Sequence, residues 1–277
     1  MSWGLALSGG AANGLANAGV LEVLEREHLK PDCIAGSSMG AIIGALAALG
    51  YHSAEIRKIA ESLTLWNIAT VSDHPLQKGL HGGILRQRLK DMLSPYIGDA
   101  LIRDCKIPFV CVAARVKKPI EWMNIIRENF TEHVRSALEP HIFSPDTPLM
   151  DAILASSAIP VVFCPVKING EEFVDLCHFG PIPARSLKET LHPDVIIATD
   201  TSPDYRSLQW MLPNGWRKFL EAGHEETKRS LSYCDLILKP KMPAAVFRFD
   251  QALAFWEAGK TEAEKRLPEI EKLLRKQ

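Results

Sequence analysis

The stretch Cys33-Ile34-Ala35-Gly36-Ser37-Ser38-Met39-Gly40 decides the fold, because a short apolar run ends there in a G-x-S-x-G pentapeptide. Residues 41–49 follow with the composition of a buried helix. A strand, a sharp turn and a helix are the context in which this pentapeptide presents its serine as a nucleophile. Both flanking glycines are then required, because a Cβ would clash where the strand and the helix cross. The alternative is a turn between two core elements in which Ser38 has no chemical role.

A second glycine-rich turn lies near the N-terminus. Residues 5–7 predict a first strand, residues 8–14 read Ser-Gly-Gly-Ala-Ala-Asn-Gly, and residues 15–29 have the apolar spacing of a helix. Such a loop gathers backbone N–H groups into a site for an anion, either a phosphate or an oxyanion. Adjacent βα loops of a parallel sheet meet at one edge, which favours an oxyanion site beside Ser38. The G-x-G-x-x-G spacing is absent, so a nucleotide-binding protein is the weaker alternative.

Together the two loops resemble the patatin-like phospholipase family, and three later segments extend the resemblance. Residues 155–163 (ASSAIPVVF) are similar to the family's A-S-x-A-x-P-x-x-F segment. Asp175 stands where the family places the aspartate of D-G-G or D-G-A, and residues 180–183 (GPIP) resemble the N-x-P stretch that follows it. The similarity covers about residues 4–240 and implies a three-layer α/β/α fold with a central, mostly parallel sheet. We expect one domain over residues 1–277.

The resemblance implies a Ser–Asp dyad without a catalytic histidine. Ser38 would be the nucleophile, Asp175 the base, and the N–H groups of Gly9, Gly10 and Ala11 the oxyanion hole. The implied reaction is hydrolysis of a lipid or other acyl ester through an acyl-serine, as in a phospholipase A or a lysophospholipase. The enzyme would contact membranes as a peripheral protein.

Four residues depart from the family pattern. Ala11 replaces a third glycine and would still donate its N–H if its φ were negative, while Asn13 replaces an arginine or lysine. Leu176 and Cys177 replace two small residues, so the loop after Asp175 either takes another path or belongs to an altered site. The second reading gives a catalytically impaired relative that binds an acyl ligand or a protein partner.

Two nearby residues need separate interpretation. His178 would complete the chain order of an α/β-hydrolase triad, but it lies too close to Asp175 in sequence to bridge the aspartate and the serine. We therefore expect a loop histidine that lines the pocket or faces solvent. Met39, next to the nucleophile, is a candidate substrate-binding residue. The chain contains no metal-binding motif, so no cofactor is expected and calcium is not implied.

The composition is that of an ordinary globular protein, with 277 residues, 47% apolar and 23% charged. A net charge of −1 gives no electrostatic reason to expect nucleic acid. Six cysteines without a C-x-x-C pair are typical of reduced thiols in the cytoplasm, and no signal peptide is visible. Residues 33–54 contain no Asp, Glu, Lys or Arg, yet a strand, turn and buried helix explain them better than a membrane span. The oligomeric state stays open.

The remaining segments are expected to form the helices and strands that support the two loops. We expect helices over residues 53–63 and 84–93, strands over residues 108–116 and 195–200, and two C-terminal helices within residues 249–275, broken near Leu267-Pro268. Residues 120–148 and 208–220 are rich in large apolar side chains. They would form either a lid or acyl channel, or plain core and dimer contacts.

Overall fold

A mostly parallel sheet lies at the centre of the protein, as seen in a computed structural model that describes residues 2–62, 69–71, 85–118, 130–159, 163–176, 181–202, 214–243 and 248–275. Its strands are linked by hydrogen-bonded pairs along the path β10-β9-β1-β2-β5-β8-β7, and β6 also pairs with β5. The strands of this sheet are β1 (Trp3–Leu7), β2 (Cys33–Gly36), β5 (Phe109–Val116), β6 (Leu138–Ile142), β7 (Val166–Ile168), β8 (Glu171–Val174), β9 (Val195–Thr199) and β10 (Leu236–Leu238). A separate antiparallel pair joins β3 (Ala69–Val71) to β4 (Leu85–Gln87).

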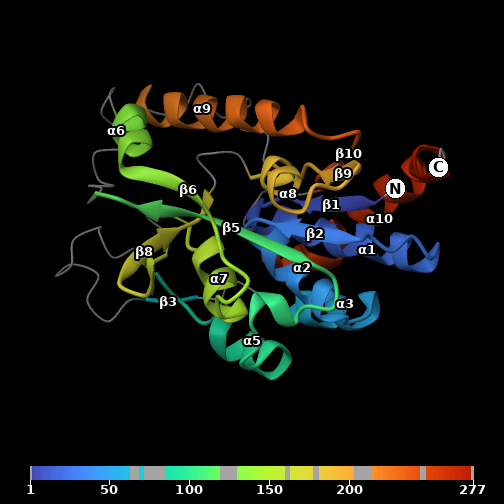
Figure 1. Ribbon diagram of the computed structural model, residues 1–277, viewed down its shortest axis with the longest axis horizontal. Helices are drawn as coiled ribbons and strands as arrows, with labels where there is room; N and C mark the ends of the chain where they lie inside the picture. Colours follow the sequence, from blue (N-terminus) through green and yellow to red (C-terminus); the bar gives the residue numbers. More distant parts are fainter. Residues whose placement is uncertain are drawn as a thin grey trace.

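Helices cover both faces of the sheet (Figure 1). The α-helices in chain order are α1 (Ala16–Arg26), α2 (Met39–Leu49), α3 (Ser53–Ser62), α5 (Leu89–Ile97), α6 (Phe130–Ala137), α7 (Leu149–Ser156), α8 (Ala184–Leu191), α9 (Asn214–Leu231) and α10 (Ala252–Arg275). The described residues also form the short 3-10 helices η1 (Ala11–Leu15), η3 (Ile102–Asp104) and η7 (Phe249–Gln251).

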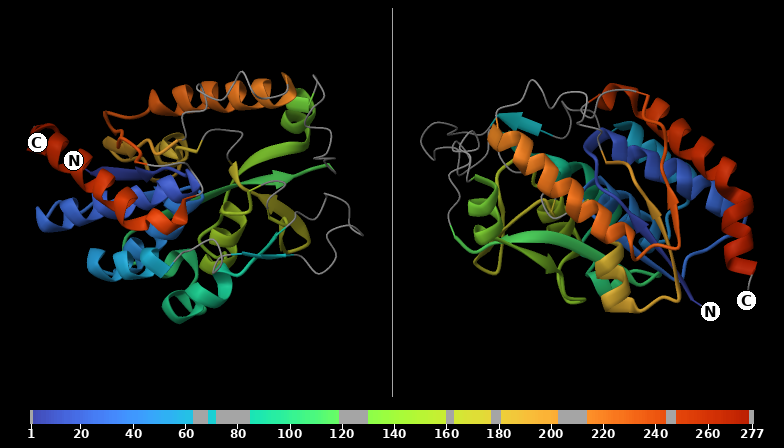
Figure 2. Two further views of the ribbon diagram at one scale, coloured as in Figure 1. Left: turned by 180° about the vertical axis from the view of Figure 1, so that it is seen from behind. Right: turned by 90° about the horizontal axis from the view of Figure 1, so that it is seen from above.

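Strand alternation produces two hydrophobic cores, one on each face of the sheet. Leu5 and Leu7 of β1 enter the larger core, which also contains residues of α1, α2, α3, α5, α7 and α10. Ala6, between them, enters the smaller core with residues of α6 and α8. Figure 2 shows α8 and α9 on the opposite side of the sheet from α1, α3 and α10. The predicted three-layer α/β/α architecture is therefore confirmed.

Most predicted elements around the two glycine-rich loops are confirmed. The strands β1, β2, β5 and β9 and the helices α1, α2 and α3 lie within one or two residues of expectation, apart from a 3-10 start and an earlier end of the first helix. The uncharged stretch 33–54 consists of β2, the serine turn, α2 and the first residues of α3. Within the described ranges, no helix combines the length and apolarity needed to cross a bilayer.

Two predictions about helices were wrong. Residues 84–93 do not form one helix, because residues 85–87 pair with β3 and the helix begins at Leu89 and continues to Ile97. The C-terminal region does not break at Pro268, since α10 is continuous from Ala252 to Arg275. A proline removes one backbone hydrogen bond but need not end a helix when packing holds both halves. Here Ala263 and Ile270, on either side of Pro268, are both fully buried.

Candidate active site

Ser38 occupies a strained turn between β2 and α2. Its backbone has φ 52° and ψ −126°, a region that residues with a side chain rarely adopt. A Cβ on Gly36 would lie 2.5 Å from the Ala41 Cα, and one on Gly40 would lie 2.2 Å from the Leu7 carbonyl oxygen. Both approaches are closer than real Cβ contacts, so the expected need for these glycines is confirmed.

The strands β2 and β8 lie on the same edge of β5. The Pro108 carbonyl accepts a hydrogen bond from the Ile34 N–H, whereas the Cys111 carbonyl accepts one from the Phe143 N–H, beside β6. Carbonyls three residues apart in an extended strand point to opposite edges, so β2 and β6 flank β5 on opposite sides. Because β6 and β8 pair with overlapping residues of β5, β8 must share the edge of β2.

This arrangement brings the segments that carry Ser38 and Asp175 toward each other. The strand β2 runs parallel to β5 and ends beside Cys111, while β8 runs antiparallel and ends beside Ala114. Three residue steps along β5 separate the two ends, which corresponds to about 10 Å. Ser38 follows the end of β2, and Asp175 follows the end of β8. Both residues are buried, with 6% and 3% of their surface exposed.

The turn that ends α7, residues 156–158, contacts both of these segments. The Ser38 N–H donates to the Ser156 Oγ at 2.8 Å. The Asp175 N–H donates to the Ala158 carbonyl at 2.9 Å. The resemblance had singled out this segment only as part of a family pattern, and the structure shows what it contacts.

The glycine-rich loop lies against the same site, since a Cβ on Gly9 would approach the Ser38 Cβ to 2.9 Å. The Gly9 N–H donates to the Pro181 carbonyl at 2.9 Å, so it is not available to an oxyanion in this conformation. Among the described residues, none accepts a hydrogen bond from the N–H of Gly10 or of Ala11. The set of candidate oxyanion donors therefore narrows from three to these two.

Ala11 does not have the negative φ on which its role as an N–H donor was made conditional. Its φ is 47°, in the left-handed region. The alanine thus adopts a backbone that suits the glycine of the family pattern, at a cost of about 1–2 kcal/mol. The reason lies in the tight start of η1, where the Asn13 N–H bonds the Gly10 carbonyl.

Thr201 fixes the glycine-rich loop from the end of β9. Its hydroxyl donates to the Gly9 carbonyl at 2.9 Å, and its N–H donates to the Ser8 Oγ at 2.8 Å. The Asn13 Nδ2 donates to the Thr201 carbonyl at 3.3 Å. A Cβ on Gly10 would lie 2.4 Å from that same carbonyl oxygen. Sequence reasoning missed Thr201, although its place after a core strand at this edge of the sheet was a usable signal.

The next residue toward the strand, Asp200, is a buried carboxylate with its own partners. The Lys239 Nζ lies 2.7 Å from one carboxylate oxygen, and the Ser202 N–H donates to the other at 3.1 Å. This pairing holds the chain around Thr201. In the described part of the chain, no group of three or more His, Cys, Asp or Glu residues has the arrangement of a metal site.

The other predicted site residues differ in what the structure shows. Leu176 is 6% exposed, packs into the smaller core, and is not among the described residues with positive φ. The backbone at residue 176 therefore accommodates leucine without the angles that would demand glycine. Met39 is 5% exposed and packs on Gly14, so its role as a substrate contact stays a prediction. Cys177 and His178 lie outside the described residues, as do residues 120–129 and 208–213 of the two candidate lid regions.

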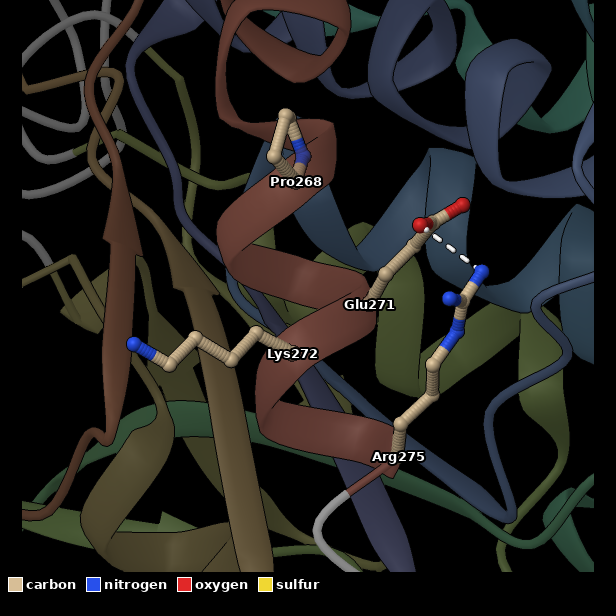
Figure 3. Close-up of a pocket in the computed structure, with 4 residues that line it drawn as sticks. All are labelled: Pro268, Glu271, Lys272 and Arg275. Carbon is tan, nitrogen blue, oxygen red and sulfur yellow. Dashed lines mark hydrogen bonds and ion pairs between the residues drawn. The ribbon is translucent and has the colours of Figure 1, made fainter.

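A surface hollow of about 450 Å³ lies elsewhere, lined by Pro268, Glu271, Lys272 and Arg275 of α10 (Figure 3). Glu271 and Arg275 form an ion pair there at 2.9 Å. Figure 2 places this end of α10 near the N-terminus, where β1 begins. Ser38 follows the opposite, carboxyl ends of the strands. The hollow is therefore not part of the candidate active site.

A family comparison decides the relationship. The model of the patatin-like phospholipase family matches residues 5–175, from β1 to the candidate aspartate. The chain belongs to this family. Over 180 residues it is 30% identical to an uncharacterized NTE family protein of Mycobacterium tuberculosis. The aligned segment covers 65% of this chain and 43% of that protein.

Relatives with lower identity to this chain are called Lysophospholipase NTE1. The protein from Candida albicans is 24% identical and that from Saccharomyces cerevisiae 25%, each over 78% of this chain. The chain spans only 15% and 12% of those proteins. VipD from Legionella pneumophila shares the fold, with a TM-score of 0.53, 14% identity, and coverage of 97% of this chain and 67% of VipD.

Proposed function

We propose that this patatin-like protein is a serine esterase that hydrolyses acyl esters of lipids, with Ser38 as nucleophile and Asp175 as base. The strained Ser38 turn, which follows β2 on the edge of β5 that β8 also uses, is the observation that carries the proposal. Backbone strain of about 1–3 kcal/mol persists only where surrounding structure enforces it, and such residues cluster at active sites.

The reaction needs only groups of this site. The Ser38 Oγ attacks the ester carbonyl carbon while its proton passes to the Asp175 carboxylate. The N–H groups of Gly10 and Ala11 stabilise the negative oxygen of the tetrahedral intermediate, each such donor contributing about 3–4 kcal/mol. As the intermediate collapses, the leaving alkoxide takes the proton from Asp175 and the acyl group stays on Ser38.

The second half repeats these steps with water. A water molecule gives a proton to Asp175 and its oxygen attacks the acyl carbon. The Ser38 Oγ leaves, recovers the proton from Asp175, and the fatty acid is released. Asp175 is 3% exposed, which provides the dry setting that a carboxylate base requires.

The names of the fungal relatives favour phospholipids or lysophospholipids as substrates. We propose that the protein takes such lipids from a membrane surface in the cytoplasm. The five described cysteines are free, as a reducing compartment would leave them. Burial raises the pKa of Cys33 and Cys105 to about 11 and of Cys111 and Cys234 to about 12, so these thiols are unreactive.

Covalent labelling with a fluorophosphonate probe tests the dyad. We expect wild type to be labelled at Ser38 and to release fatty acid from lysophosphatidylcholine, and both signals to vanish in Ser38→Ala and Asp175→Asn. Wild type that binds an acyl ligand tightly but is neither labelled nor active would contradict the proposal and indicate the catalytically impaired relative. Protection against heat by a nucleotide would instead favour the nucleotide-binding alternative.

A further inference from the structure

The turn formed by residues 156–158 supplies one acceptor to each member of the proposed dyad. The Ser156 Oγ accepts from the Ser38 N–H at 2.8 Å, and the Ala158 carbonyl accepts from the Asp175 N–H at 2.9 Å. The helix α7 that carries this turn packs on β5, β8 and α2, so it is fixed by the core (Figure 1). The backbones of both residues are thus tied to acceptors two residues apart.

The hydrogen bond to Ser156 meets a need of the strained turn. The chain leaves the sheet at Ser37, whose N–H still donates to the Leu7 carbonyl at 3.2 Å. The Ser38 N–H comes next, is buried, and has a side-chain hydroxyl as its acceptor. Ser156 is fully buried at the end of α7, which packs on β5 and α2, so the core fixes the position of its side chain.

The adjacent serine differs in one respect. Ser157 is also buried, but its Oγ has no hydrogen-bond partner among the described residues. The chain therefore offers a matched pair of buried serines, only one of which contacts the nucleophile.

We propose that Ser156 is a positioning residue, which holds Ser38 in its strained conformation and at its working distance from Asp175. This inference rests on the proposed serine esterase function. Ser156 contacts the backbone of Ser38 and touches no reacting atom. Its effect therefore passes through the position of Ser38 and falls on the chemical step rather than on lipid binding. A misplacement of about 1 Å in a catalytic group can lower a rate about 100-fold.

Steady-state kinetics on lysophosphatidylcholine, compared for wild type, Ser156→Ala and Ser157→Ala, test this role. We expect Ser156→Ala to lower kcat about 10- to 100-fold with KM within about twofold of wild type. The rate of fluorophosphonate labelling should fall by the same factor, because it reports the attack by Ser38. Ser157→Ala should match wild type in all three quantities.

Circular dichroism checks that each variant is folded. If Ser156→Ala does not fold, Ser156→Cys replaces it, since a thiol fills the same space but accepts hydrogen bonds weakly; its kcat should still fall with KM unchanged. Equal losses in the two serine variants, or a wild-type kcat in Ser156→Ala or Ser156→Cys, would overturn the inference while leaving the esterase intact. Wild type that shows neither turnover nor labelling would overturn the proposed function and this inference together.

Discussion

Replacing Ser38 by glycine should make the protein more stable than replacing it by alanine, although both variants lose the hydroxyl. Alanine keeps the Cβ that makes φ 52°, ψ −126° unfavourable, whereas glycine adopts this region freely. The comparison therefore isolates the backbone strain from the loss of the nucleophile.

The size of the effect follows from two opposing terms. A residue with a side chain held in such a region stores about 1–3 kcal/mol. Glycine loses more conformational entropy than alanine on folding, which lowers the stability gained by about 0.5–1 kcal/mol. The midpoints of these two ranges give a net gain of about 1 kcal/mol for Ser38→Gly over Ser38→Ala. For a chain of this size, each kcal/mol moves Tm by about 2–4 °C, so the expected difference is about 2–4 °C.

Thermal unfolding followed by circular dichroism measures this difference, and urea unfolding gives it as a free energy. Neither variant should release fatty acid or react with a fluorophosphonate. A glycine variant that melts at or below the temperature of the alanine variant would refute the reasoning, because the turn would then not be strained. The test depends only on stability and holds whatever the substrate is.

Three further predictions concern residues near the site and on the surface. Ala11→Gly should raise the free energy of unfolding by about 0.5–1 kcal/mol in urea, because φ 47° suits glycine; an unchanged midpoint would contradict this. Leu176→Gly, which restores the family residue, should cost about 3 kcal/mol or more through lost packing, without raising the rate of hydrolysis; a faster enzyme would show that leucine impairs the base. The hydrogen bond to Glu25 raises the pKa of His52. The contribution of this contact to the free energy of unfolding is therefore fully present at pH values below the unfolded pKa near 6.5, and it is lost as pH rises through the folded pKa. NMR titration should show the His52 pKa falling in Glu25→Gln, and equal values in both proteins would exclude the effect.

The sequence sufficed where the determining interactions are local. The serine turn and the glycine-rich loop each combine a strand, a glycine pattern and a helix within about 20 residues, so neighbouring residues define them. Residues 84–93 show the limit of this reasoning. Leu85, Leu89 and Leu93 have helical spacing, but pairing with β3 takes Leu85 into a strand. Nothing in the local pattern distinguishes the two outcomes.

Partners distant in sequence could not be predicted in the same way. A family pattern indicated Asp175, yet the approach of its strand toward the serine turn depends on β8 running antiparallel on the edge of β5 that β2 also uses. Ser156 accepts from an N–H group 118 residues away in the sequence, and Thr201 donates to a carbonyl 192 residues away. Neither has a signature in the sequence, because a buried serine or threonine fits many core positions.

The hydrogen bonds around the site show why the matched region alone is not the whole catalytic unit. The family match ends at Asp175 and so includes both proposed dyad residues and the glycine-rich loop. However, the Gly9 N–H of the loop donates to the Pro181 carbonyl, and the Gly9 carbonyl accepts from the Thr201 hydroxyl. The latter follows β9, which pairs with β1 on the side away from β2. Removing the chain beyond residue 175 would expose that edge of β1 and release the loop from both contacts. The proposed nucleophile and base thus come from the matched region, whereas the geometry of the candidate oxyanion donors depends on the residues that follow it.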